Sequence, residues 1–95
     1  SIGMNALMHL DQDGDLGRLI SQRNWAEISS RLSILLPIGV SYNLTVYDEE
    51  LNILNDSPIL SGDLNAKSVV SIQYVVVDRE SLNLYIVRLQ LAWVK

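Results

Sequence analysis

The stretch NWAEISSRLSILLPIGVSYNLTVY, residues 24–47, changes its hydrophobic period at Pro37. Before the proline, apolar residues recur every three or four positions, which predicts a helix with one buried face. From Val40 to Tyr47 they alternate with polar residues, which predicts a half-buried strand. Because the residue before a proline avoids the helical conformation, Pro37 is expected to end the helix. The stretch therefore predicts a helix that leads directly into a sheet.

The helix of this stretch has a clear beginning and a clear apolar face. Asn24 is a good N-cap residue, and Glu27 follows three positions later, close to a capping box. The apolar face consists of Trp25, Ile28, Leu32, Leu35 and Leu36. Upstream, MNALMHL (residues 4–10) and LGRLI (residues 16–20) have the same period and predict two shorter helical segments.

Downstream of Pro37 the pattern is that of strands. After residues 40–47, a short returning strand is predicted at residues 51–54, a long third strand at 68–78 and a fourth at 84–95, with residues 55–65 as a loop. The third strand is apolar on both faces. We favour a central position or helix cover for it; the alternative is that its second face meets a partner.

These elements predict the fold class. The long third and fourth strands are joined by a short turn and should pair as an antiparallel hairpin. The helix must bury its apolar face against one face of the sheet. We therefore expect one α+β domain over residues 1–95, with a helical segment (1–37) packed on one face of a four-stranded antiparallel meander (40–95).

Composition narrows the function classes. The chain is 48% hydrophobic, which favours a packed globule over disorder. Its formal net charge of −4 and its scattered basic residues disfavour nucleic-acid binding. The absence of cysteine excludes disulfides, thiolate zinc sites and cysteine nucleophiles. No apolar run in the sequence approaches the roughly 18 residues that a membrane helix needs.

The sequence HLDQDGDLGRLI, residues 9–20, resembles the start of a calcium-binding loop. Asp11, Asp13 and Asp15 occupy loop positions that supply calcium ligands, and we treat them as weak calcium candidates. The glycine required at the sixth position is replaced by Leu16, and the bidentate glutamate at the twelfth by Gln22. An acidic turn, in which Asp13 or Asp15 caps the next helix, is the simpler interpretation.

The sequence contains few other residues that suggest a functional site. His9 is the only histidine, no nucleophile elbow accompanies it, and a surface position on the first helix is expected. The acids at positions 48–50 are interpreted as a solvated turn. Asn43 and Asn55 stand in N-x-[ST] sequons, and Asn43 is the glycosylation candidate because it lies on the polar face of its strand. We predict no catalytic residues, no cofactor and no enzyme activity.

Several of these segments, taken in order, suggest a family. MNALMHLDQDG is followed by LLPIGVSYNLTVYD, then by SVVSIQYVVVD and a closing YIVRLQLAW. In this order the chain resembles the exported domains of archaeal pilin-like or membrane-anchored surface proteins of uncharacterised function. The matching parts run from Leu35 to Val46 and from Val87 to Trp93, and the resemblance covers nearly the whole chain.

This resemblance implies a soluble extracellular domain whose membrane helix lies upstream of Met4. The expected function is then non-enzymatic, through protein–protein contacts or self-assembly at a sheet face or edge, with the membrane reached only through that helix. The alternative is a small cytosolic ligand-binding or regulatory α+β module.

Overall fold

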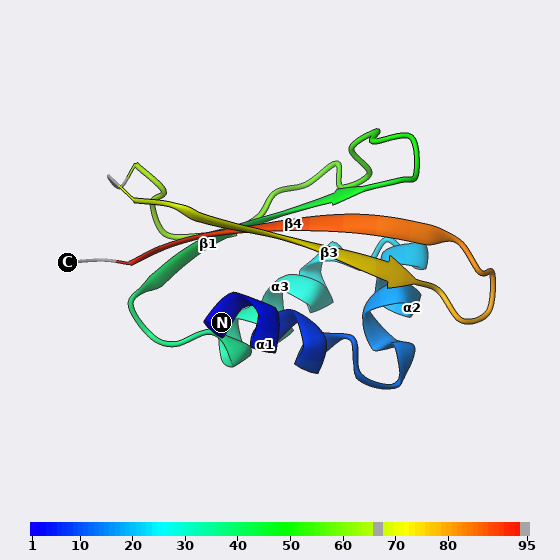
Figure 1. Ribbon diagram of the computed structural model, residues 1–95, viewed down its shortest axis with the longest axis horizontal. Coiled ribbons are helices and arrows are strands. Elements are labelled where there is room, and N and C mark those ends of the chain that lie inside the picture. Colours follow the sequence, from blue (N-terminus) through cyan, green and yellow to red (C-terminus); the bar gives the residue numbers. More distant parts are fainter. Residues whose placement is uncertain (66–67, 94–95) are drawn as a thin grey trace.

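The computed structural model describes residues 1–65 and 68–93, and in them it confirms an α+β fold (Figure 1). The helical segment contains α1 (Ile2–Leu10), the short 3-10 turn η1 (Gln12–Gly14), α2 (Asp15–Ser21) and α3 (Trp25–Leu35). The strands are β1 (Val40–Tyr47), β2 (Ile59–Ser61), β3 (Val70–Val77) and β4 (Leu84–Trp93). The predicted continuation of the last strand to residues 94 and 95 lies outside the described residues.

The ends of the helices follow from their capping residues. The Ser1 Oγ atom accepts a hydrogen bond from the Met4 N–H (3.1 Å) and starts α1. As predicted, Asn24 caps α3, with its Oδ1 atom accepting from the Glu27 N–H (3.3 Å), and the helix ends just before Pro37. The prediction that an aspartate side chain caps α2 is wrong. Gly14, at φ 74°, occupies the N-cap position there without a side-chain bond.

The strand order corrects the predicted meander. The order is β2-β1-β4-β3 with every neighbouring pair antiparallel, so the first and last strands form the centre. β3 is therefore an edge strand, and the favoured central position for it is wrong. Helices α1 and α2 cover its inner face, and no helix of the described residues covers its outer face. Its apolar outer side chains suggested burial, but within residues 1–65 and 68–93 it pairs only with β4.

The second strand also differs from the prediction. Residues 51–54 contain only an isolated bridge between Ile53 and Tyr47, and β2 lies instead at residues 59–61, in a segment predicted as loop. The apolar residues of the earlier segment stay exposed; Leu51 is 64% accessible and has a left-handed backbone (φ 66°). Ile59 is fully buried, which explains why this segment joins the sheet.

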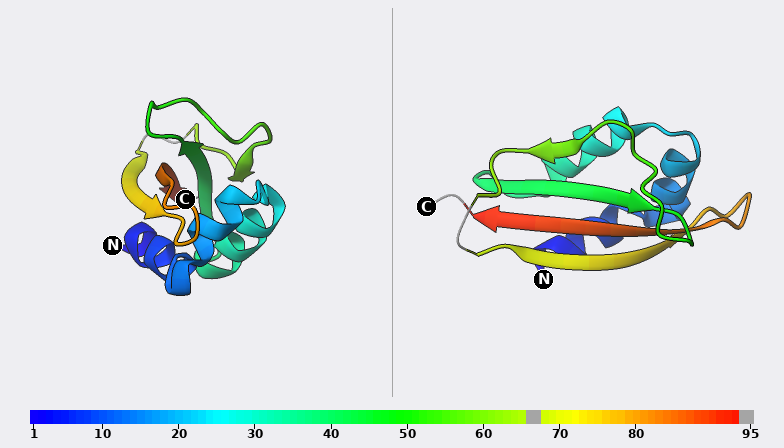
Figure 2. Two further views of the ribbon diagram at one scale, coloured as in Figure 1. Left: turned by 90° about the vertical axis from the view of Figure 1, so that its right-hand side faces the viewer. Right: turned by 90° about the horizontal axis from the view of Figure 1, so that it is seen from above.

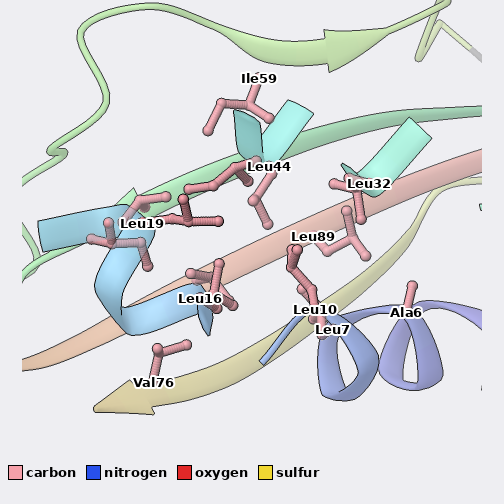
Figure 3. Packing of buried hydrophobic residues seen from close by; sticks show 14 of the residues in the cluster. Ala6, Leu7, Leu10, Leu16, Leu19, Leu32, Leu44, Ile59, Val76 and Leu89 are labelled. Carbon is pink, nitrogen blue, oxygen red and sulfur yellow. The ribbon is translucent and has the colours of Figure 1, made fainter. Parts of the chain in front are cut away.

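Helices and sheet form two layers. Figures 1 and 2 show all three helices on one side of the sheet, with α1 beneath β3, while α3 contacts β2 at the other edge. The core lies between the layers, and Figure 3 shows Leu7, Leu16 and Leu32 of the helices facing Leu44 and Leu89 of the central strands. The opposite face of the sheet, which we call the outer face, is not covered by any helix of the described residues.

Glycine allows a close approach between α2 and β3. A Cβ atom on Gly17 would lie 2.6 Å from the carbonyl oxygen of Val77 and 2.9 Å from the Cα of Asp78. Only glycine lets the helix rest on the backbone of the strand at this distance. The helix layer thus supports β3 from below, while nothing in the described residues pairs with its other edge.

Candidate functional site

The outer face of the sheet follows from the strand register. It carries Ser41, Asn43, Thr45 and Tyr47 of β1, Leu60 of β2, the even-numbered residues of β4 from Leu84 to Ala92, and Ser71, Gln73, Val75 and Val77 of β3. Near β3 this face is apolar and open, since Val75 is 57% and Val77 43% accessible. Its middle is polar, so it is a mixed surface rather than a second core.

Arg88 lies in the middle of the outer face. It stands between Thr45 and Gln73 in the register, and its guanidinium carbon is 5.8 Å from the centre of the Tyr47 ring, a cation–π distance. Its Nε atom is buried and has no hydrogen-bond partner among the described residues. A guanidinium in this position can receive a carboxylate or carbonyl oxygen from a partner.

The free edge of β3 is a second part of the same surface. The Asp78 N–H donates to the Asn83 carbonyl (2.9 Å), so even-numbered residues of β3 direct their backbone groups toward β4. The alternation agrees at β1, where the Val46 carbonyl accepts from the Leu54 N–H on the side of β2. The N–H and C=O groups of the odd residues of β3 therefore point away from the sheet; these are Ser71, Gln73, Val75 and Val77.

The structure separates the three calcium candidates. Asp11 accepts a hydrogen bond from the Tyr74 hydroxyl (3.0 Å), and Asp15 pairs with Arg18 (3.1 Å) and Arg31 (3.2 Å). Asp13 has a left-handed backbone at φ 56°. Within residues 1–65 and 68–93, no three His, Asp or Glu side chains are grouped so that they could hold a metal ion. Asp11 and Asp15 thus join the acidic turn to other elements of the fold.

These contacts set the charge state of the acids. Partial burial raises the pKa of Asp11, although the hydrogen bond from Tyr74 acts in the opposite direction. Burial, followed by the hydrogen bond to Asp11, raises the pKa of Tyr74 as well. For Asp15, the hydrogen bond from Arg18 lowers the pKa. The Asp11–Tyr74 bond joins the end of α1 to the inner face of β3, so it positions the edge strand.

The two sequons have different environments. Asn43 lies on the outer face, as predicted, and its Nδ2 donates to the Gln90 side chain (3.3 Å). The side chain of Asn55 has a structural role, because its Oδ1 accepts from the Val46 N–H (2.9 Å) and its Nδ2 donates to the Ser57 carbonyl (3.1 Å). Asn43 remains the candidate for glycosylation.

One polar cluster was not predicted from the sequence. The Oδ2 atom of Asp78 accepts from the hydroxyls of Ser21 (2.7 Å) and Ser81 (2.8 Å), and the Ser21 oxygen lies 2.8 Å from the Tyr85 hydroxyl. These hydrogen bonds lower the pKa of Asp78, and the bond from Ser21 has the largest effect. The hydrogen bonds of this cluster do not involve His9, which is exposed on α1. The cluster ties α2 to the β3–β4 turn; the motif DRES, with an acid and a serine three apart, is its only sequence signal.

The acids at positions 48–50 form the predicted turn. The Asp48 carboxylate accepts from the side chain and backbone of Asn52, which lowers its pKa, and from the Glu50 N–H. Beside this turn lies an open groove of about 410 Å³ between Arg23, Leu54 and Tyr85. Its walls include the acids of the turn, Asp48, Glu49 and Glu50.

Comparisons with protein families, with curated proteins and with solved structures found no match to this chain. In the described part of the chain, no helix has both the length and the apolar character needed to cross a bilayer. Any functional proposal therefore depends on the geometry of the outer face and the β3 edge, together with the resemblance found in the sequence.

Proposed function

We propose that this chain is a non-enzymatic, outward-facing domain of a membrane-anchored archaeal surface or pilus-like protein, and that it acts through protein–protein contacts. The contact surface is the β3 edge together with the adjoining part of the outer face. The domain is extracellular, and a helix upstream of Met4 anchors it. The two-layer arrangement of helices and antiparallel sheet agrees with the resemblance on which this proposal rests.

The observation that carries the proposal is the open edge of β3. Eight residues long and without a charged side chain, this strand presents the backbone groups of four residues away from the sheet. Edge strands of monomeric proteins are usually short, charged or covered, because a long uncharged edge recruits further strands. An edge that lacks such protection is therefore well suited to protein contacts.

The test uses the complete anchored protein on archaeal cells. A photo-crosslinking amino acid replaces Gln73, beside the free edge, and in a matched variant replaces Ile34, which is 81% accessible on α3. We expect cross-linked protein adducts from position 73 and few from position 34. Equal yields, or none from position 73, would contradict the proposed contact surface.

The location is tested separately. A protease added to intact cells should release the domain, and the gene should encode about 20 consecutive apolar residues upstream of Ser1. A gene without such an apolar run would instead favour the cytosolic module.

A further inference from the structure

We infer that the partner at the β3 edge is a second copy of the same chain, and that the two β3 strands pair antiparallel about a twofold axis at Tyr74. This inference rests on the proposed function and names the partner of its contact surface. The two four-stranded sheets would then join into one continuous sheet, with both helix layers on the same side.

The register follows from the direction of the free backbone groups. Only the odd residues of β3 direct these groups outward, so an antiparallel partner must place its own odd residues opposite them. When Gln73 faces Val75 of the partner copy, Ser71 faces Val77 of the partner copy, and all four odd residues are used on both strands. This register forms about eight backbone hydrogen bonds, and a shift by two residues in either direction leaves some of these groups unpaired.

The absence of charged side chains on β3 favours pairing between two identical strands. The free edge contains no ionisable side chain between Val70 and Val77 except the Tyr74 phenol, so the twofold register brings no like charges of the two strands together. On the outer face Val75 would have Gln73 of the partner copy beside it and Val75 of the partner copy as its diagonal neighbour. These valine side chains, 57% accessible in the single chain, would lose contact with water.

The inner side of the edge is also suited to such a contact. Tyr74, half-buried and held by Asp11, would lie directly opposite Tyr74 of the partner copy, and facing aromatic pairs stabilise antiparallel strands. By helical geometry, Met4 and Met8 lie on the flank of α1 away from α3, which is the flank beneath the free edge; Met8 is 55% accessible.

Sedimentation velocity measures the association over a concentration range from about 10 µM to about 1 mM, where a small interface is expected to saturate. We expect a monomer–dimer equilibrium that salt strengthens, because salt screens the repulsion between copies of net charge −4. Val75→Lys should remove the dimer, since it places two lysines close together at the axis. The matched control Leu60→Lys, on the outer face at the other edge, should leave the dimer intact.

Two single-cysteine variants test the register, since the chain has no cysteine of its own. Ser71→Cys and Val77→Cys would face each other at about 5.5 Å between Cα atoms, within disulfide range. Oxidation of the mixture should give a cross-linked dimer, while each variant alone should not. A dimer that forms without this cross-link, or one that survives Val75→Lys, would overturn the inference.

The experiment separates this inference from the proposed function. A chain that stays monomeric up to about 1 mM overturns the dimer. If position 73 on cells then still cross-links to proteins other than the chain itself, the contact surface stands with a different partner. If position 73 gives no adduct at all, both fail.

Discussion

The two edges of the sheet differ in how they are protected from solvent. At one edge β2 has three residues, Pro58 precedes it, and Gly62 follows it at φ 79°. The chain then folds over the outer face, where the Asp63 N–H donates to the buried Ser41 hydroxyl (3.1 Å). At the other edge β3 has eight residues and no charged side chain, and no strand in the described part of the chain pairs with its free side. The same sheet is thus closed on one side and open on the other.

The closed edge shows how the backbone groups of an edge strand are protected in this molecule. Where β2 no longer reaches, the Asn55 side chain accepts from the Val46 N–H and replaces a strand. No side chain does this for Gln73 or Val75 within the described residues. Since both edges share one core, the difference reflects what their side chains and flanking segments do, and substitutions can probe each edge separately.

The largest expected effect comes from the core that holds both edges. Leu89→Ala should lower the free energy of unfolding by about 3 kcal/mol, because Leu89 is fully buried between Leu44 and Ile72. Gln90→Ala, the next residue but on the outer face, should cost less than about 0.5 kcal/mol. Urea denaturation measures both values. Equal losses would mean that the outer face is packed as tightly as the core.

A smaller loss of stability is expected from a substitution in α2, which packs beneath the open edge. Gly17→Ala should cost about 2 kcal/mol, because its Cβ must push α2 away from the backbone at Val77. As a control, Gly39→Ala meets open space and bears only the strain of φ 90°, about 1 kcal/mol. Thermal unfolding compares the two, and an unchanged stability of Gly17→Ala would contradict the close packing of α2 on β3.

A substitution at the closed edge should have a more local effect. Asn55→Ala leaves the Val46 N–H without its partner and should cost about 1 kcal/mol, whereas Asn65→Ala, at an exposed site, should be neutral. Hydrogen exchange should become faster at Val46 in the first variant. A Val46 amide that stays protected would show that something other than Asn55 closes this edge.

The smallest effect concerns pH at the β3–β4 turn. Because the folded-state pKa of Asp78 is lowered, its ionised form adds stability above the unfolded-state pKa of about 4, and this contribution is lost as pH falls through the folded-state value. Asp78→Asn should therefore be less stable at neutral pH and should lose less stability on acidification. Denaturation at several pH values measures this, and parallel pH profiles would contradict the assignment.

Local patterns predicted much of this fold. The alternation at residues 40–47 and the stop at Pro37 are short-range signals, and the structure has both β1 and the end of α3 at these places. Strand order depends on contacts distant in sequence, so the pairing of β1 with β4 was not predictable from period alone. The valines of β3 suggested a central strand, because a sequence does not distinguish burial inside a sheet from exposure at a sheet edge.

The candidate surface was only partly predictable. Its polar positions on β1, such as Asn43, followed from the period of two. Trp93, the last residue of β4, is 45% accessible because β4 extends past the helix layer. The free edge could be identified only from the strand register, and that register is defined by pairing in three dimensions.

The most direct test of the open edge is amide hydrogen exchange along β3, measured by NMR on the Val75→Lys variant, which is expected to be monomeric. We predict alternation, with slow exchange at Ile72, Tyr74 and Val76, which bond to β4, and fast exchange at Ser71 and Gln73. Slow exchange at all of these amides in the monomer would mean that the edge is already covered within the chain, and would contradict the account.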